Sequence, residues 1–499
     1  MTLDHDAARA VRTYLLASGY TPQGVLARVG PAAFDALASG LLAPMRRALA
    51  DPPAQPVDPL IRLFLLGDPV PACALPPPVA EALGRLGLAT VQDVEGVSHL
   101  VALLDVRPYG EPDTDWYLVS DLGAPAESDH VLGVGGASLT LARITPRTMV
   151  ARALDLGCGS GVQVAHLARH ARHVTATDLN ERALHVAGLT AALSGVPAEQ
   201  LDLRAGSLFE PVAGQQFDLI VSNPPFVVSP GHRFTYRDAG LPGDEVSRRV
   251  VRDAAAHLTP GGRAVVLANW LHVAGEDWRD RVADWLAGTG VSAWIVQRDT
   301  EPVAQYAATW LRDGGIAEGA ALEASLDEWL DVFATWNAQA VGFGWAVLVA
   351  PTATSAGEEP WRHLEDLSQT PRLPSGDEVE AFLRGCERVE RMTLPALLAA
   401  PFQLANGATI TTERHRLDGS ELTAPPRVGL TGRVGPGGWR ATMPVPPALL
   451  AALLDNSDTP IGARLDIAAQ AEGLDPLDVL PTAVIALREL LRLGIVRTV

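Results

Sequence analysis

Three alternating glycines in the sequence could hold a nucleotide-like ligand. The run Asp155-Leu156-Gly157-Cys158-Gly159-Ser160-Gly161 ends an apolar stretch and precedes a segment with helical spacing. Glycines at such a turn let the backbone approach a ligand where a Cβ atom would collide. The pattern alone is weak, because a turn that packs a helix on a strand looks similar, but its position after a predicted strand strengthens it.

A carboxylate follows at the end of the next apolar run. This residue is Asp178, in the segment HVTATDLN. A carboxylate after the second strand of such a fold can accept hydrogen bonds from both hydroxyls of a ribose. Together with the glycine turn, Asp178 favours a nucleoside cofactor, and a nicotinamide-dependent dehydrogenase is the natural competing interpretation.

The fourth predicted strand ends in the most specific motif, Asn223-Pro224-Pro225-Phe226. The two prolines fix φ and remove donors, so the nearby carbonyl groups are held as rigid acceptors. The Asn223 amide oxygen could accept one N–H of an NH2 group and the Pro224 carbonyl the other, while Phe226 stacks on a planar group. The motif therefore predicts a site for an amide or exocyclic amine nitrogen. The alternative is a strand that simply ends in a proline turn.

With these motifs the chain resembles the class I S-adenosylmethionine-dependent methyltransferases, in particular the Asn-Pro-Pro-Tyr/Phe branch that methylates planar nitrogen. The resemblance rests on five segments in order: DLGCGSG, ATDLNERAL, GSLFEP, NPPF and LTPGGRAVV. It implies S-adenosylmethionine as the cofactor and catalytic roles for Asn223, Pro224, Pro225 and Phe226. It also implies cofactor contacts by Asp155, Gly157, Gly159, Gly161, Asp178, Leu179, Ser207, Leu208 and Asn223.

The resemblance assigns parts of the cofactor to these residues. Asp155 and the glycine turn would contact the methionine part, and Asp178 would hold the ribose. Ser207 and Leu208 fall where related proteins often present Asp and an apolar residue to the adenine, so the serine departs from the pattern. Residues 132–145 precede the first strand, where the family places a helix over the cofactor.

A polar loop, Tyr236 to Asp238 and Gly240 to Asp244, follows the proline motif. It is of the kind that closes on a substrate, and a plain surface loop is the alternative. No metal is expected, because sulfonium transfer depends on in-line positioning and no His, Cys or Asp cluster has ligand spacing near the site.

The elements that must position these residues form an α/β pattern. From Arg152, short apolar strands alternate with amphipathic helices, which is typical of a doubly wound, Rossmann-like parallel sheet. Seven strands are predicted: RALDLGCG, HVTATDLN, DLRAGSLF, FDLIVSNPPF, GGRAVVLANW, VSAWIVQRDT and GFGWAVLVAP. Between the sixth and seventh, residues 301–340 predict an extra helical layer or lid.

Five segments are expected along the chain. Residues 1–55 predict a mostly helical segment, and residues 56–150 predict a winged-helix-like unit that leads into the core. The methyltransferase core spans 151–351, and a linker rich in Pro, Ser, Gly and acids spans 352–378. Residues 379–499 predict a C-terminal α+β domain that is compatible with a winged helix.

Composition narrows the function classes. All 39 basic residues are arginine, which excludes Schiff-base chemistry and a P-loop lysine. The net charge of -19 disfavours non-specific nucleic-acid binding. The sequence contains no apolar run of the roughly 18 residues that would span a bilayer. The three cysteines include no CxxC pair, so we expect neither a zinc site nor a disulfide framework, which fits a cytoplasmic protein. Because a membrane-spanning run is missing, no association with a membrane is expected.

Three functions remain open from the sequence. The first is an N-methyltransferase of a protein glutamine, as in the release-factor methyltransferases that the core resembles, and the net acidity favours it. The second is a methyltransferase of adenine N6 or guanine N2 in RNA or DNA, which the winged-helix candidates favour through nucleic-acid binding. The third is a non-catalytic, cofactor-binding interaction protein, which the intact NPPF motif disfavours.

Overall fold

The computed structural model describes residues 3–94, 96–110, 114–123, 129–230, 241–316, 318–352, 359–367, 372–413, 427–434, 439–455 and 457–498. The chain forms two units. The first comprises Met1–Ala142 and Thr148–Ser368, and the second comprises Arg143–Arg147 and Gln369–Val499.

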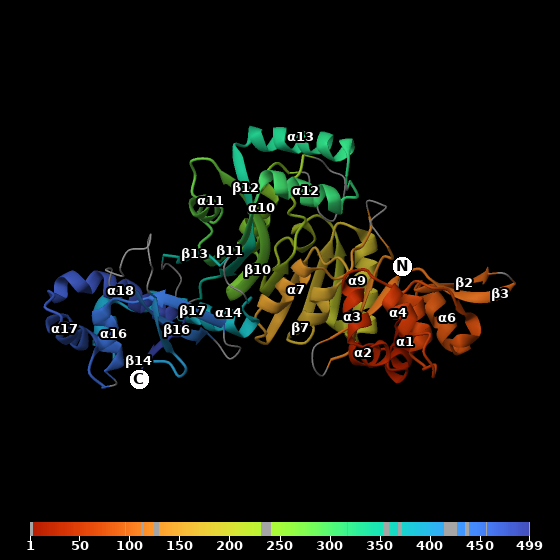
Figure 1. Cartoon of the computed structure of the whole chain (residues 1–499), viewed down its shortest axis with the longest axis horizontal. Coiled ribbons are helices and arrows are strands. Elements are labelled where there is room, and N and C mark those ends of the chain that lie inside the picture. Colours follow the sequence, from red (N-terminus) through yellow and green to blue (C-terminus); the bar gives the residue numbers. More distant parts are fainter. Residues whose placement is uncertain are drawn as a thin grey trace, which may run out of the picture. The chain divides into compact units, whose positions relative to one another are not determined.

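The first unit is built on an eight-stranded sheet, coloured from gold to teal in Figure 1. Its strands, in chain order, are β6 (Val150–Leu156), β7 (Ala171–Asp178), β8 (Leu201–Ala205), β9 (Phe217–Ser222), β10 (Leu258–Val273), β11 (Ser292–Pro302), β12 (Ala338–Val349) and β13 (Arg362–Asp366). Their order across the sheet is β13-β11-β12-β10-β9-β6-β7-β8. The seven predicted strands are all present, and the α/β, Rossmann-like fold class is confirmed.

Two features of this sheet differ from the sequence prediction. β12 runs antiparallel to both of its neighbours, β10 and β11. β13 is an eighth strand that pairs with β11 in parallel, although it lies inside residues 352–378, where a linker is predicted. Its sequence, RHLED, has no apolar run, because an edge strand leaves its side chains half-exposed.

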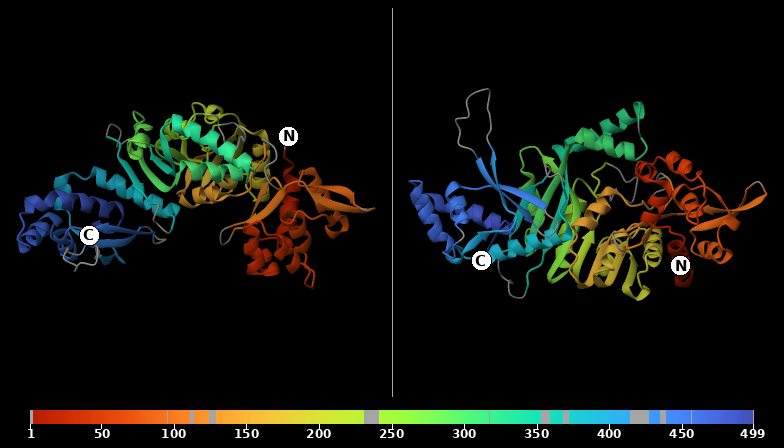
Figure 2. Two further views of the ribbon diagram at one scale, coloured as in Figure 1. Left: turned by 45° about the horizontal axis from the view of Figure 1, so that its top comes forward. Right: turned by 60° about the horizontal axis from the view of Figure 1, so that its bottom comes forward.

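The helices of this part of the first unit connect the strands: α7 (Gly136–Ile144), α8 (Val162–Leu167), α9 (Glu181–Leu193), α10 (Glu245–Ala256), α11 (Trp278–Asp284), α12 (Val303–Asp313) and α13 (Ala320–Thr335). Short 3-10 turns, η3 (Ala198–Gln200) and η4 (Glu210–Val212), flank β8. The helical layer predicted at 301–340 is α12 and α13, which lie side by side beyond one end of β10 and β12 (Figures 1 and 2). Aromatic side chains hold this pair together, with Tyr306, Trp329 and Phe333 in one buried cluster.

The N-terminal part of the first unit shares its hydrophobic core with α9. Its elements are α1 (His5–Ala17), α2 (Pro22–Val29), α3 (Pro31–Ala38), α4 (Ala43–Ala48), α5 (Asp58–Leu60), the π-helical turn η1 (Ile61–Leu65), β1 (Val70–Pro71), η2 (Ala72–Ala74), α6 (Pro77–Arg85), β2 (Ala89–Val94), β3 (Val97–Ala102), β4 (Asp105–Tyr109) and β5 (Trp116–Ser120). The Arg12 guanidinium donates to the carbonyl of Leu193, and the Val119 amide donates to Thr190 Oγ1. Helices followed by a β-hairpin occur in the predicted order, and the winged-helix assignment stays a prediction.

The second unit combines helices with short strands. Its elements are α14 (Gly376–Arg391), α15 (Leu394–Ala399), β14 (Phe402–Leu404), β15 (Thr409–Glu413), β16 (Arg427–Val434), β17 (Trp439–Pro444), α16 (Pro447–Leu454), α17 (Ile461–Ala471), α18 (Pro476–Arg492) and β18 (Val496–Thr498). β15, β16 and β17 form one antiparallel sheet, and β14 pairs with β18. The predicted α+β character is present, and a winged helix here also stays a prediction.

Candidate active site

The predicted site residues follow neighbouring parallel strands. β6 lies between β9 and β7, so the order of the sheet reverses at β6. In open α/β sheets, ligands bind beyond the carboxyl ends of the strands where the order reverses. Three predicted features therefore meet at the carboxyl ends of these strands: the glycine turn after β6, Asp178 at the end of β7 and Asn223 after β9. The Ser222 hydroxyl, which donates to the Leu156 carbonyl at 2.8 Å, ties the ends of β9 and β6 together.

Glycine is suited to the three positions of the turn for different structural reasons. All have positive φ, with values of 75° at Gly157, 51° at Gly159 and 80° at Gly161. A Cβ atom on Gly157 or Gly159 would meet open space, so these positions leave room beside the backbone. A Cβ atom on Gly161 would lie 2.9 Å from Ala187 Cα on α9. Gly161 therefore lets α8 and α9 pack closely, whereas Gly157 and Gly159 are the ones suited to a ligand.

Asp155 is the most unusual carboxylate of the site. It is only 1% exposed, and its Oδ2 atom has no hydrogen-bond partner among the described residues. Burial, together with the nearby charge of Asp178, raises the pKa of Asp155 from 3.8 to about 8. A buried acceptor without a partner lowers the stability of the protein unless a ligand supplies the missing donor. Asp155 is thus suited to a cationic or hydrogen-bond-donating ligand.

Asp178 is held by the backbone around it. Its Oδ2 accepts from the Gly159 amide and its Oδ1 from the Asn180 amide, both at 2.9 Å. Burial raises the pKa of Asp178 above its ordinary value. Each carboxylate oxygen can accept more than one hydrogen bond, so the oriented group retains acceptor capacity for hydroxyls. Next to it, the Leu179 side chain is 62% exposed and offers an apolar surface.

Ser207 and Leu208 lie in a turn attached to the end of β7. The Gly206 amide donates to the Asp178 carbonyl at 3.0 Å, which brings the following residues beside Asp178 and Leu179. Leu208 has a φ of 46°, a left-handed conformation that is strained for a leucine and is common near functional sites. The turn is therefore placed to approach the same ligand from the β8 side.

Asn223 contacts the helix that precedes β6. Its Nδ2 atom lies 3.4 Å from Ser138 Oγ on α7, and Gln163 Nε2 donates to the Ser138 carbonyl at 2.8 Å. α7 lies within the segment 132–145 for which a helix over the cofactor is predicted. Pro224, Pro225 and Phe226 follow Asn223 as an extended stretch, partly exposed at Pro225 and Phe226.

One residue that supports the motif was not predicted from the sequence. The Val228 amide, two residues beyond Phe226, donates to the Tyr306 hydroxyl at 2.8 Å. Tyr306 comes from α12 and is fully buried, and Asn269 Nδ2 on β10 lies 3.4 Å from the same hydroxyl. The sequence predicted the helical segment 301–340 that contains Tyr306. It did not indicate which aromatic residue of that segment would contact the motif.

Other sequence predictions concern features around the site. Of the predicted closing loop, Tyr236 to Asp238 and Gly240 lie outside the described residues, whereas residues 241–244 are described and lead into α10. Whether this loop closes on a substrate stays a prediction. No group of three or more His, Cys, Asp or Glu side chains among the described residues could hold a metal ion. None of the described helices is long and apolar enough to cross a membrane.

Comparison with known families agrees with this geometry. Residues 133–277 match the "Methyltransferase small domain" model. The chain contains a class I methyltransferase domain. Residues 17–100, before the methyltransferase domain, match "Domain of unknown function (DUF7059)".

Three curated methyltransferases are similar to this domain. The ribosomal protein uL3 glutamine methyltransferase of Bradyrhizobium diazoefficiens is 37% identical over 23% of this chain and 40% of its own length. The release factor glutamine methyltransferase of Gloeobacter violaceus is 38% identical over 22% and 43%. The ribosomal RNA small subunit methyltransferase C of Salmonella arizonae is 34% identical over 34% and 45%. The chain thus spans less than half the length of each relative.

Proposed function

We propose that this protein is an S-adenosylmethionine-dependent N-methyltransferase that acts on a planar nitrogen, with a protein glutamine as the acceptor. The observation that carries the proposal is the buried Asp155 carboxylate, whose Oδ2 has no hydrogen-bond partner among the described residues, beside the open glycine turn. Asp155 lies at the carboxyl ends of the strands, next to the point where Asn223 follows the neighbouring strand β9. A cationic, nucleoside-like cofactor and a planar NH2 group would be brought together at that edge.

The residues present fit this cofactor. The ammonium group of its methionine part would supply the donor that Asp155 Oδ2 lacks, beside the backbone of Gly157 and Gly159. The ribose hydroxyls would donate to Asp178, and the adenine would rest near Leu179, Ser207 and Leu208. When bound, the cofactor supplies an electrophilic methyl group on a sulfonium.

The chain contributes positioning and electrostatics to the transfer. The Asn223 side-chain oxygen and the Pro224 carbonyl would each accept one N–H of the acceptor, and Phe226 would stack on its plane. The nitrogen gains the methyl group as the bond between that methyl and the cofactor sulfur breaks, which leaves a neutral thioether. Positive charge grows on the nitrogen as the new bond forms, and the nitrogen then releases one proton to water. Fixed carbonyl acceptors stabilise that charge more strongly than they stabilise the neutral acceptor. Tyr306 would act as a positioning residue, since its hydroxyl holds the backbone at Val228.

Two acceptor classes are suggested by the relatives. The uL3 and release-factor relatives are named as glutamine methyltransferases, and the net charge of -19 also favours a protein acceptor. The second candidate is a base of ribosomal RNA, which is favoured by the match to ribosomal RNA small subunit methyltransferase C over 34% of the chain.

Radiolabelled methyl transfer into cell extract separates the two candidates. The full chain is incubated with extract and labelled S-adenosylmethionine, and the products are treated with nuclease or with protease before a gel. We expect the label to survive nuclease and to disappear with protease, and hydrolysis to release methylated glutamine. Label that disappears with nuclease would assign the second candidate, and the absence of any label would contradict the proposal.

A further inference from the structure

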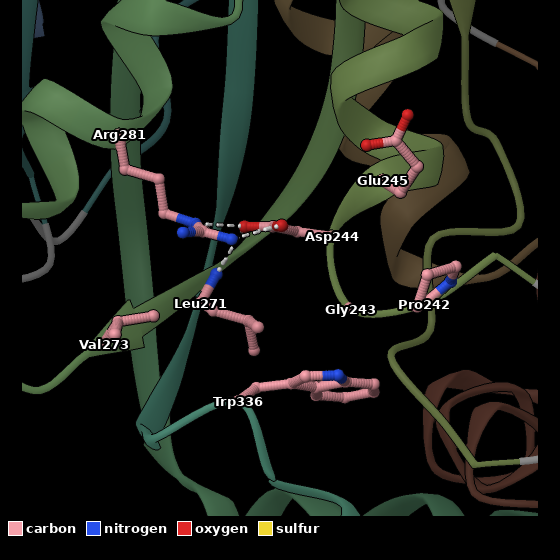
Figure 3. A pocket seen from close by; sticks show the side chains of 8 residues that line it. All are labelled: Pro242, Gly243, Asp244, Glu245, Leu271, Val273, Arg281 and Trp336. Carbon is pink, nitrogen blue, oxygen red and sulfur yellow. Dashed lines mark hydrogen bonds and ion pairs between the residues drawn. The ribbon is translucent and has the colours of Figure 1, made fainter.

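A pocket of about 410 Å³ lies at the carboxyl end of β10, apart from the residues assigned above to cofactor binding. Figure 3 shows the Trp336 indole on one side of it and the Leu271 side chain pointing toward that ring. Gly243 and Pro242 form a further wall, and Asp244 and Arg281 face each other on the far side of Leu271 from the indole. The pocket therefore joins an aromatic and apolar surface to a charged one.

The sheet register gives the distance of this pocket from Ser222, the residue before the proline motif. Ser222, which precedes Asn223, pairs with Val266 on the parallel strand β10. Leu271 lies five residues farther along β10, which corresponds to roughly 16 Å at about 3.3 Å per residue. The same distance spans about five residues of an extended peptide. A residue within about five positions of the methylated group could therefore reach the pocket.

The charged wall is rigid and carries excess negative charge. Asp244 Oδ2 accepts from Arg281 Nε at 2.7 Å and from the Leu271 amide at 3.0 Å, and Oδ1 accepts from Arg281 Nη2 at 2.8 Å. Arg281 Nη1 also contacts Glu276 Oε2 at 3.2 Å. Two carboxylates thus share one guanidinium, so a negative charge is left over. Asp244 Oδ1 accepts one hydrogen bond, from Arg281 Nη2, and has the capacity to accept another.

The surface beside the pocket is also negatively charged. Trp336 directly follows α13, which contains Glu323, Asp327, Glu328 and Asp331 and no basic residue. Glu245 lines the pocket itself, with its carboxylate held by Arg248 at 2.6 and 2.7 Å. A phosphate backbone would be repelled here, whereas a cationic side chain would be attracted.

We propose that this pocket receives an arginine or lysine side chain of a protein acceptor, within about five residues of the glutamine that is methylated. The aliphatic stem would pack against Leu271 and Val273, and the cationic head would lie on the Trp336 ring, with the excess negative charge around Asp244 on the far side of Leu271. This inference rests on the proposed function and narrows its substrate to glutamines with a basic neighbour.

Peptide kinetics with the full chain test the inference. Each synthetic peptide carries one glutamine and one arginine at successive distances from it, and a matched peptide carries citrulline, which is planar but neutral. We expect the arginine peptide to be preferred by about tenfold in kcat/KM at the favoured spacing, mainly through KM. Trp336→Ala should reduce this preference to about twofold or less, and Trp336→Phe should restore most of it.

A matched pair of charge variants tests the carboxylates. Glu245→Gln, in the pocket lining, should lower the preference for arginine, whereas Glu199→Gln, an exposed residue of η3 beside the edge strand β8, should leave it unchanged. Affinity for S-adenosylmethionine should be the same in all variants, which verifies that the methyltransferase domain is folded.

The outcomes separate this inference from the proposed function. Glutamine methylation without a preference for arginine, or a preference that survives Trp336→Ala, overturns the inference and leaves the proposed function standing. Failure of the wild type to methylate any glutamine peptide, together with label in nuclease-sensitive material from extract, overturns both and assigns the acceptor to nucleic acid.

Discussion

Replacing Asp155 by asparagine should stabilise the protein while weakening cofactor binding. The pKa of Asp155 is about 8 in the folded protein and 3.8 as an ordinary aspartate. Between these values the folded state retains a proton that the unfolded state has lost, so the free energy of unfolding falls as pH rises. The slope is about 1.4 kcal/mol per pH unit, or about 3 kcal/mol from pH 5 to pH 7. Asparagine keeps the shape and removes this loss.

Urea unfolding of the full chain, followed by tryptophan fluorescence, measures this effect. The transition that shifts when S-adenosylmethionine is added to the wild type identifies the methyltransferase domain. In that transition, the advantage of Asp155→Asn over wild type should grow by about 3 kcal/mol between pH 5 and pH 7. S-adenosylmethionine should stabilise the wild type far more than the variant. A difference that does not change with pH, or equal cofactor affinity in the two proteins, would refute the assignment of Asp155.

Three further results are expected. Asp178→Ala should weaken S-adenosylmethionine binding by about tenfold or more in calorimetry, because the charged acceptors of the ribose hydroxyls are lost. Unchanged affinity, or a preference for NAD, would contradict that role. Tyr306→Phe should lower kcat by about tenfold without changing cofactor affinity, since the Val228 amide loses a buried partner, and an unchanged kcat would remove Tyr306 from the positioning residues. EDTA should leave turnover intact, and activity that is lost in EDTA and restored by a divalent ion would show a metal requirement.

The strands that form the sheet were predictable because buried strands have nearly continuous apolar runs, as in FDLIVS of β9. The edge strand β13 was missed because its charged sequence has no such run. The antiparallel direction of β12 was also beyond prediction, since an apolar run does not indicate which way a strand runs. These differences depend on the position of a strand in the sheet.

Residue types predict Asp155, Asp178 and Asn223 as site residues, and the structure places them at the carboxyl ends of three neighbouring strands. The packing around them was not predictable from residue types. Gly161 belongs to the predicted glycine turn, yet its missing Cβ allows contact with Ala187 on the next helix. The contact between Tyr306 and Val228 joins residues far apart in the sequence, and only the packing of α12 on the sheet brings them together. The pocket at Trp336 likewise combines four separate segments; the sequence singled out the loop that ends at Asp244, but not its association with Leu271, Arg281 and Trp336.

The turnover of Asn223→Ala on a methylated acceptor, measured together with cofactor affinity, tests the central claim most directly. Removing a preorganised acceptor of this kind costs on the order of 3 kcal/mol, or about a hundredfold in kcat. Binding of S-adenosylmethionine should stay normal, because Asp155 and Asp178 are unchanged. Asn223→Asp, which keeps an oxygen acceptor, should be more active than the alanine variant. A kcat for Asn223→Ala close to that of the wild type would mean that the motif is only a proline turn, and the planar-nitrogen proposal would fail.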